Sequence, residues 1–455
     1  MRWRILLFVC SIFLSAENLV SQDALALTPP MGWNSWDGYG TTINEAQVKA
    51  NAQWMAEHLK AFGWQYLTVD MEWFVSNPTA EGNSKSFQYS LDQNGRYTPA
   101  VNRFPSAANG AGFKPLADYV HSLGLKFGIH ILRGIPRQAV ANKLPIADSS
   151  FSVADAADTS DTCPWNFDNF GAIATQPAAQ AYYDSIAKMY AGWGVDLIKV
   201  DCISSHPYKG EDIRMIRKAL DKAGRPIVLS LSPGAAPLDK LNEMRKYAQM
   251  WRISDDIWDI WHNDDAYPKG LGDQFEYTAA WAGKGEPGHW PDADMLPFGR
   301  LGPAPGWGKP RDTRLSHDEQ RMLMTLWVIF PSPLMVGGEL PDADAWTLSL
   351  LTNPEVIAVD QHSSGNRPVI NTKNTVVWLA QAASGDGQYL AVFNLTESKA
   401  DIRYGWKELG LAGTAYTLRD LWEHRDLGAA TALTVELPPH AGVLYRVMPT
   451  RDGAR

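Results

Sequence analysis

The sequence has no excess of positive charge and no basic run. Its 455 residues include 41 Lys and Arg against 50 Asp and Glu, which gives a formal net charge of -9. Nucleic-acid-binding proteins gather cationic side chains against phosphate, so this balance argues against a nucleic-acid partner. The sequence also lacks a Gly-rich phosphate-binding loop, a CxxC pair and a His-rich metal spacing. We therefore expect no cofactor and no metal.

Long apolar runs are scarce, and the longest stands at the N-terminus. The basic letters MRWR precede ILLFVCSIFLSA, and small residues follow. This stretch is shorter than the roughly 20 residues that a membrane span needs. The order predicts a secretory signal peptide, residues 1–26, cleaved after Ala26 or, as the less favoured site, after Ala16. We expect a secreted or periplasmic protein without a membrane span.

Cysteine is rare, with three residues in the chain. Cys10 would leave with the signal peptide, and Cys163 and Cys202 would remain. Two cysteines in an exported chain permit one disulfide, and two free buried thiols are the alternative.

Aromatic residues are plentiful, with 19 Trp, 16 Tyr and 15 Phe, and many of the tryptophans stand beside Gly, Asp or Asn. Sugars present C–H faces that stack on aromatic rings and hydroxyls that need polar partners. The pattern favours a sugar-binding cleft, whereas core packing would account for most of these residues taken singly.

Strand-like and helical stretches alternate up to about residue 355. Eight repeats of this alternation predict a (β/α)8 barrel, with a doubly wound open sheet as the second choice. The expected strands are 31–33, 66–70, 126–130, 197–201, 227–231, 250–253, 289–294 and 333–336. The expected helices are 45–59, 114–123, 178–192, 211–223, 238–248 and 318–329.

The pattern changes from about Arg367, where short alternating runs with turn residues between them replace the strand–helix rhythm. These runs predict a C-terminal antiparallel β-sandwich. We expect a catalytic barrel over residues 27–362 and a sandwich over residues 363–455. The expected sandwich strands are 375–379, 389–393, 416–420, 433–437 and 442–446.

Acidic side chains stand at the C-terminal ends of several expected strands, where a barrel carries its functional loops. They are Asp70, Glu72, Asp201, Asp255, Asp256, Asp292 and Asp294. Lys199 shares a strand face with Asp201 and would keep that carboxylate ionised. Such a set suits either glycoside hydrolysis or a divalent cation. Lys199 and Arg252 would repel a cation, so hydrolysis is the favoured interpretation.

Several segments also resemble glycoside hydrolase family 27, the family of α-galactosidases and α-N-acetylgalactosaminidases. The resemblance runs from about residue 28 to residue 362 and implies the barrel, the sandwich and a retaining mechanism. The segments are PPMGWNSW at 29–36, the strand end at 66–73, GVDLIKVDC at 194–202, WRISDDI at 251–257, HWPDADML at 289–296, and SPLMVGGEL with NPEVIAVDQ between 332 and 361.

The resemblance assigns roles to single residues. It makes Asp201 the nucleophile and Asp256 the acid/base, with Asp255 as the rival for the second role. It also implies a disulfide between Cys163 and Cys202, although the second cysteine stands one residue earlier than usual. The residues that it places around the sugar are Trp36, Asp70, Lys199, Arg252 and Asp294.

Three departures from the family pattern concern the sugar. The α-galactosidases end strand two with two adjacent aspartates that bind O4 and O6, whereas this chain has Asp70-Met71-Glu72. Either Glu72 replaces the second aspartate, or O6 recognition is lost and a pentopyranose such as L-arabinopyranose is favoured. His130 stands where an aromatic is usual. Ser232 and Ala235 are small where α-galactosidases have larger residues, which leaves room for a 2-acetamido group or reflects a different loop.

Arg133 and Arg137 follow the third expected strand and are candidates to contact a sugar substituent. We expect an exo-acting α-galactosidase whose substrate is an α-galactoside-type oligosaccharide or glycoconjugate. The alternatives within the family are α-N-acetylgalactosaminidase and β-L-arabinopyranosidase. The alternative from another class is a carbohydrate-binding protein without turnover.

Overall fold

The computed structural model describes residues 25–79, 86–265, 267–383, 385 and 387–450. The expected signal peptide, except for its last two residues, lies outside these ranges.

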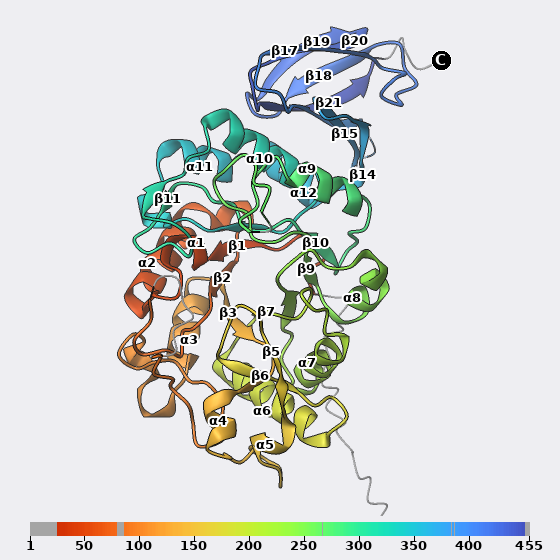
Figure 1. Cartoon of the computed structure of the whole chain (residues 1–455). Coiled ribbons are helices and arrows are strands. Elements are labelled where there is room, and N and C mark those ends of the chain that lie inside the picture. The colour runs from red at the N-terminus through yellow and green to blue at the C-terminus, as the bar shows by residue number, and fades with distance from the viewer. Residues whose placement is uncertain (1–24, 80–85, 266, 384, 386, 451–455) are drawn as a thin grey trace, which may run out of the picture.

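The N-terminal part is a barrel of eight parallel strands that neighbour one another in chain order (Figure 1). Leu296 closes the sheet through a parallel bridge to Val336 of the last strand. This confirms the predicted (β/α)8 architecture. The strands are β1 (Met31–Asn34), β2 (Tyr66–Val69), β3 (Lys126–Leu132), β7 (Leu197–Asp201), β8 (Val228–Leu231), β9 (Met250–Arg252), β10 (Trp290–Asp292) and β13 (Leu334–Val336).

At least one helix follows each barrel strand, and local sequence signals mark where several begin. Asn44 and Gln47 form a reciprocal capping box before α2, and Ser316 and Glu319 do so before α10. The helices are α1 (Trp36–Tyr39), α2 (Glu45–His58), α3 (Lys114–Ser122), α4 (Arg137–Ala141), α5 (Val153–Ala156), α6 (Pro177–Trp193), α7 (Gly210–Lys222), α8 (Leu241–Tyr247), α9 (Gln274–Trp281), α10 (His317–Ile329), α11 (Ala345–Leu351) and α12 (Pro354–His362).

Two strand ends differ by two residues from the sequence-based prediction, and the other barrel strand ends agree with it to within one residue. β3 continues past His130 to Leu132, because Leu132 still pairs with Asp201 of β7. β10 ends at Asp292 rather than Asp294, and Asp294 has a left-handed backbone with φ +88° that cannot continue a strand.

The long connection after β3 carries its own small sheet in the order β4-β6-β5. β4 (Ile135–Pro136), β5 (Ala157–Thr162) and β6 (Asn169–Ala172) are antiparallel. A hairpin of β11 (Arg300–Leu301) and β12 (Arg311–Asp312) lies in the connection after β10. Short 3-10 helices cover Lys60–Phe62, Pro105–Gly110, Leu238–Lys240 and Leu340–Asp342.

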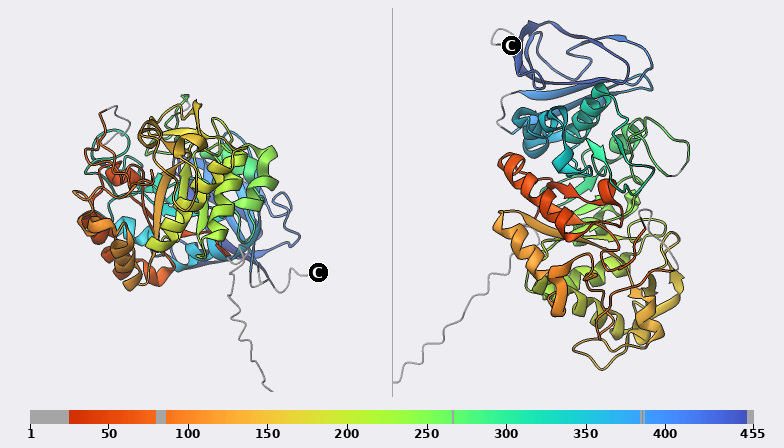
Figure 2. Two further views of the ribbon diagram at one scale, coloured as in Figure 1. Left: turned by 90° about the horizontal axis from the view of Figure 1, so that it is seen from below. Right: turned by 90° about the vertical axis from the view of Figure 1, so that its left-hand side faces the viewer.

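The C-terminal part is antiparallel and lies at one end of the molecule, beyond α10 and α12 (Figures 1 and 2). It pairs a six-stranded sheet in the order β14-β15-β16-β21-β18-β19 with the ribbon β17-β20. Three strands, β14, β17 and β19, were not predicted, because their exposed residues give no clear alternation. The strands are β14 (Ser363–Asn371), β15 (Thr375–Ala382), β16 (Gln388–Asn394), β17 (Ala400–Gly405), β18 (Tyr416–Asp420), β19 (Arg425–Ala430), β20 (Ala432–Leu437) and β21 (Gly442–Pro449).

The inward-facing side chains of β7 and β9 change from apolar to charged along the strand. Tyr66, Leu197 and Met250 belong to one buried apolar cluster at the N-terminal ends of their strands. Lys199 and Arg252 follow two residues later on the same inner face. The charged layer therefore stands at the C-terminal end of the barrel, where the functional loops begin.

Candidate active site

A cleft of about 620 Å³ opens at the C-terminal ends of the barrel strands. It contains both expected catalytic carboxylates, at the end of β7 and in the loop after β9. The lining residues are Trp36, Asp70, Met71, Pro164, Trp165, Lys199, Asp201, His206, Ser232, Pro233, Asp255, Asp256, Tyr267, Gly306, Trp307 and Gly308.

Asp70 is fixed in the floor of the cleft by three donors. Its Oδ2 accepts hydrogen bonds from Asn34 Nδ2 at 2.7 Å and Lys199 Nζ at 2.9 Å, and its Oδ1 accepts one from the Met71 amide at 2.8 Å. Burial raises the pKa of Asp70, but the charges of Lys199 and His130 and the hydrogen bonds from the Met71 amide and Lys199 together lower it more. The pKa of Asp70 therefore lies below its ordinary value. The charged pair offers a fixed acceptor and donor to sugar hydroxyls.

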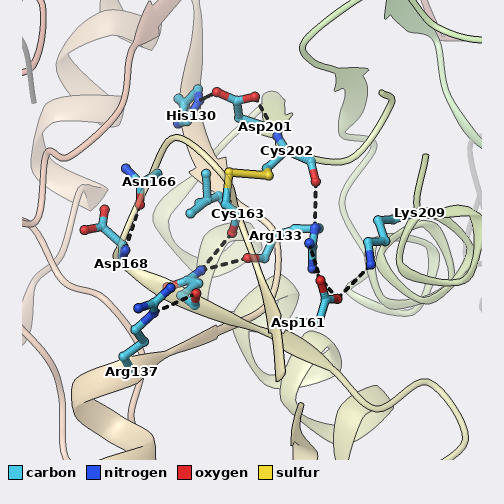
Figure 3. Close-up of a disulfide and its surroundings, with 12 residues drawn as sticks. His130, Arg133, Arg137, Asp161, Cys163, Asn166, Asp168, Asp201, Cys202 and Lys209 are labelled. Carbon is cyan, nitrogen blue, oxygen red and sulfur yellow. Dashed lines mark hydrogen bonds and ion pairs between the residues drawn. A yellow bond between two sulfur atoms is a disulfide. The ribbon is translucent and has the colours of Figure 1, made fainter. Parts of the chain in front are cut away.

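Asp201, at the end of β7, contacts the His130 ring and the backbone amide of Cys202. His130 Nε2 lies 3.5 Å from Asp201 Oδ2, and the Cys202 amide donates to Asp201 Oδ1 at 2.5 Å (Figure 3). Burial raises the pKa of Asp201, but the hydrogen bond from His130 and the charges of His130 and Lys199 lower it more. The carboxylate is therefore held ionised, as a nucleophile requires.

Asp256 is held by a buried arginine from β9. Arg252 Nη1 lies 3.1 Å from Asp256 Oδ1 and 2.7 Å from Asp294 Oδ1. Asp294 Oδ2 also accepts a hydrogen bond from the Ile257 amide at 2.8 Å, which anchors the backbone directly after Asp256. Burial raises the pKa of Asp294, and the nearby Asp256 adds to the effect against the opposing charge of Arg252. Arg252 and Asp294 thus position Asp256 from below and do not line the cleft themselves.

Asp255, the rival for the acid role, also lines the cleft but pairs outwards. Its Oδ1 lies 3.4 Å from His206 Nε2, and the His206 side chain is 55% exposed. Burial raises the pKa of Asp255, against the opposing charges of His206 and Arg252. Asp256 therefore contacts the buried Arg252, whereas Asp255 contacts the exposed His206.

The disulfide between Cys163 and Cys202 is present, and it joins the loop after β5 to the end of β7 (Figure 3). Arg133 supports the same point, because its Nε donates to the Cys202 carbonyl at 2.6 Å and its guanidinium forms two hydrogen bonds with Asp161. Arg133 is therefore committed to the scaffold.

Arg137 also points away from the cleft. Its guanidinium lies 4.7 Å from the centre of the Phe170 ring, and its Nε donates to the Asn169 carbonyl. The hypothesis that Arg133 or Arg137 contacts a sugar substituent is not supported by their positions.

The end of β2 turns Met71, and not Glu72, towards the cleft. Among the described residues, Met71 belongs to the lining and Glu72 does not. Glu72 is fully buried, and its Oε1 accepts a hydrogen bond from Asn166 Nδ2 at 3.1 Å. His130 is likewise buried below the lining, where its contact is with Asp201.

Ser232 and Trp36 line the cleft as expected. Gly306, from the loop between β11 and β12, donates its amide hydrogen to the Trp36 carbonyl at 3.2 Å. A Cβ atom on Gly306 would lie 2.3 Å from the Trp36 ring, so only glycine allows this close approach.

Four aromatic or histidine side chains of the lining were not predicted from the sequence: Trp165, His206, Tyr267 and Trp307. They come from four different loops and belong to none of the quoted motifs. The abundance of tryptophan beside glycine was the one available signal, since Trp307 lies between Gly306 and Gly308.

Metal-binding groups and membrane-spanning helices were sought within the residues that the structure describes. Within them, no group of three or more His, Cys, Asp or Glu side chains is arranged to hold a metal ion. No helix that the structure describes combines the length and apolar character needed to cross a membrane.

Comparison with known proteins gives consistent matches over nearly the whole chain. A family model described as Alpha galactosidase A matches residues 167–362, and one described as Alpha galactosidase C-terminal beta sandwich domain matches residues 372–447. An α-galactosidase of Cyamopsis tetragonoloba is 30% identical over 441 residues, which cover 96% of this chain and 90% of the relative.

Two other relatives carry different names. An α-N-acetylgalactosaminidase of Mus musculus is 26% identical over 408 residues, covering 85% of this chain and 81% of the relative. The crystal structure of a family 27 β-L-arabinopyranosidase from Geobacillus stearothermophilus is 49% identical, with a TM-score of 0.91, and covers 94% of this chain and 98% of that one.

Proposed function

The chain belongs to glycoside hydrolase family 27, the family of the α-galactosidases, and on this premise we propose that it is a retaining exo-β-L-arabinopyranosidase. The β-L-arabinopyranosides have the ring configuration of α-D-galactosides and lack only the hydroxymethyl group at C5. The proposal places a terminal sugar of this configuration over Asp70, Lys199 and Asp201.

In the proposed mechanism, Asp201 attacks the anomeric carbon while Asp256 protonates the leaving oxygen. Asp256 then takes a proton from water, which releases the sugar from Asp201 with its configuration retained. The low pKa of Asp201 and its place in the same cleft as Asp256 support this division of roles. Arg252 and Asp294 support it further, because they fix the backbone and side chain of Asp256.

Met71 is the observation that carries the choice of sugar. The thioether of Met71 is a weak hydrogen-bond acceptor and offers no partner to an O6 hydroxyl. Glu72 is buried against Asn166 and offers none at the cleft surface. A buried hydroxyl without a partner costs about 1–3 kcal/mol, so a sugar that lacks O6 is favoured. The 49% identity to a β-L-arabinopyranosidase agrees with this choice.

α-Galactosidase activity is the second candidate, because Asp70 and Lys199 keep an arrangement suited to the ring hydroxyls that both sugars share. The test is a panel of 4-nitrophenyl β-L-arabinopyranoside, α-galactoside and α-N-acetylgalactosaminide. We expect the highest kcat/KM for the first. A higher value for either of the others would contradict the assigned sugar, and turnover of none would contradict the reaction class.

The mechanism has a separate test. Proton NMR of the first-formed sugar should show the anomer of the substrate. The Asp201→Asn variant should lose at least about a thousandfold in kcat, because the nucleophile is removed. A binding protein without turnover would show no wild-type activity and would keep its affinity for the sugar after this substitution.

We also propose that the chain is exported, with residues 1–26 as the signal peptide, and that residues 27–362 form the catalytic domain. The order of basic, apolar and small residues at the N-terminus supports export. N-terminal sequencing of the secreted protein tests it, and Leu27 is the expected first residue.

A further inference from the structure

The cleft has room for more than one sugar ring, since its volume of about 620 Å³ lies well inside the range of sites that enclose a whole ligand. Exposure of its side chains rises outwards. Asp70 is 2% exposed, Asp201 14%, Asp256 27% and His206 55%. The nucleophile therefore lies deeper than the acid/base, and the leaving group departs towards His206.

The outer zone is chemically different from the floor. The floor is charged, with Asp70, Lys199 and Asp201, whereas aromatic rings line the outer part from three separate loops. The aromatic residues of this outer zone are Trp165, Tyr267 and Trp307.

Both tryptophans are tied to the loop that carries Asp256. The Trp165 ring packs edge-on against His206 at 6.5 Å, and His206 pairs with Asp255. On the other side, Trp307 packs on Trp258 with ring centroids 5.5 Å apart. These contacts fix the positions of the two indole rings with respect to Asp256, the residue proposed to protonate the glycosidic oxygen.

The support behind Trp307 is rigid. Arg311 and Arg314 lie over the Trp307 ring at 5.3 and 5.1 Å, and both bind the buried carboxylate of Asp259. Trp165 is anchored two residues away by the disulfide at Cys163. Pre-organised aromatic surfaces of this kind bind flat rings at little entropic cost.

We infer that Trp165 and Trp307 form an aglycone subsite that binds a ring-shaped leaving group with a flat apolar face. The inference rests on the proposed function, because it takes Asp256 as the acid. The His206–Asp255 pair adds hydrogen-bonding groups at the same place, so the subsite accepts either a second pyranose ring or a planar phenol. A pyranose ring presents a flat C–H face and a phenol presents a flat π face, and either face can stack on the indole ring of a tryptophan.

The test compares leaving groups that fill this subsite with one that cannot. Glycosyl fluorides lose a single atom, whereas the 4-nitrophenyl glycoside and a disaccharide place a ring in the subsite. β-L-Arabinopyranosyl and α-galactosyl fluorides are both used, so that the result does not depend on the sugar assignment. Kinetics are measured for wild type, Trp165→Ala, Trp307→Ala, and Trp165→Phe, which keeps a ring.

We expect each alanine variant to lose about tenfold in kcat/KM on ring-bearing substrates and to stay within about twofold of wild type on the fluorides. Trp165→Phe should recover most of the loss. Phe167→Ala is the matched control, because Phe167 is exposed in the same loop and lies outside the lining. It should behave as wild type.

Other results would overturn the aglycone subsite or identify the ring that it binds. A parallel loss on fluorides and ring-bearing substrates would overturn the subsite, because the tryptophans would then only support the catalytic centre. No loss on either would overturn it as well. A loss confined to the phenol or to the disaccharide would identify which ring the subsite takes. Wild-type inactivity on both fluorides would refute the proposed function, and the subsite with it.

Discussion

In the proposed function, Met71 determines which hydroxyl of a sugar the floor of the cleft recognises. The neighbouring Asp70 and Lys199 form a charged pair at 2.9 Å, whereas Met71 contributes only a thioether and methylene groups. A sugar with an O6 hydroxyl would leave that hydroxyl without a hydrogen-bond partner beside Met71, whereas a sugar without O6 carries no such cost in binding free energy. Discrimination of this kind belongs to a single side chain.

Met71→Asp should shift the preference towards α-galactosides. The new carboxylate offers O6 an acceptor, so the ratio of kcat/KM for galactoside to that for arabinopyranoside should rise about tenfold or more. The ratio is measured with the matched 4-nitrophenyl glycosides. Met71→Leu is the control and should leave the ratio unchanged. An unchanged ratio in Met71→Asp would show that residue 71 does not face C5 of the bound sugar.

His130 sets the charge state of Asp201 without lining the cleft. The pKa of Asp201 lies below its ordinary value, so this carboxylate stays ionised at a lower pH than an ordinary aspartate does. Removing His130 should raise the pKa of Asp201 towards its ordinary value. Burial raises this pKa, and without His130 fewer charges and hydrogen bonds oppose that effect.

The acidic limb of the kcat/KM profile should therefore move to higher pH in His130→Gln, and further in His130→Phe. Gln keeps a hydrogen-bond donor but no charge, and Phe keeps neither. The basic limb should stay where it is. His121→Gln is the control, since His121 pairs with Asp196 away from the cleft. An acidic limb that does not move in either His130 variant would refute this role.

At the scale of elements, loops from distant parts of the chain meet around the end of β7. The disulfide joins the loop after β5 to Cys202, and Arg133 at the end of β3 holds the Cys202 carbonyl at 2.6 Å. Cys202 has a left-handed backbone, with φ +61°, which places its amide on Asp201. The backbone conformation next to Asp201 therefore depends on contacts from two other elements.

Loss of the disulfide should lower both stability and affinity. The cross-link closes a segment with a sequence separation of 39 and stabilises by about 3–4 kcal/mol in the loop-entropy model. We expect reducing agent, or Cys163→Ser, to lower the melting temperature by several degrees. KM for a 4-nitrophenyl glycoside should rise, because the Trp165 loop is released.

Thiol titration provides the check on the disulfide. The native protein should show no reactive thiol, and reducing agent should have no further effect on the melting temperature of Cys163→Ser. Two titratable thiols in the untreated protein would contradict the cross-link.

At the scale of the whole molecule, one apolar core extends from the barrel into the sandwich. Phe275 of α9 packs on Phe393 of β16 with ring centroids 5.1 Å apart, and Phe330 packs on Trp378 of β15 at 6.2 Å. These residues belong to a single buried cluster. A shared core of this kind couples the unfolding of the two parts.

Differential scanning calorimetry of the full chain should therefore show a single transition. Phe393→Ala should lower its midpoint while keeping it single, because the lost packing costs about 3–5 kcal/mol at the shared core. Activity should disappear over the same temperature range. Two separated transitions in the wild-type protein would contradict the coupling.

Local sequence was enough for much of the architecture and for placing Asp201 and Asp256 at the same end of the barrel. The period of two along β7 places Lys199 and Asp201 on one face, and capping residues mark the starts of α2 and α10. The predictions were weakest for β14, β17 and β19, because exposed strands bury no regular face that leaves a pattern in the sequence.

The sequence by itself determined the alternation that builds the barrel, the charged layer at its C-terminal end, and the family to which the chain belongs. These follow from near neighbours along the chain, whose spacing sets which side chains share a face. Tertiary structure alone decided that Glu72 turns to Asn166 and leaves Met71 at the cleft, and that Trp165 and Trp307 flank it. Such contacts join residues tens to hundreds of positions apart, and only the packed chain brings them together.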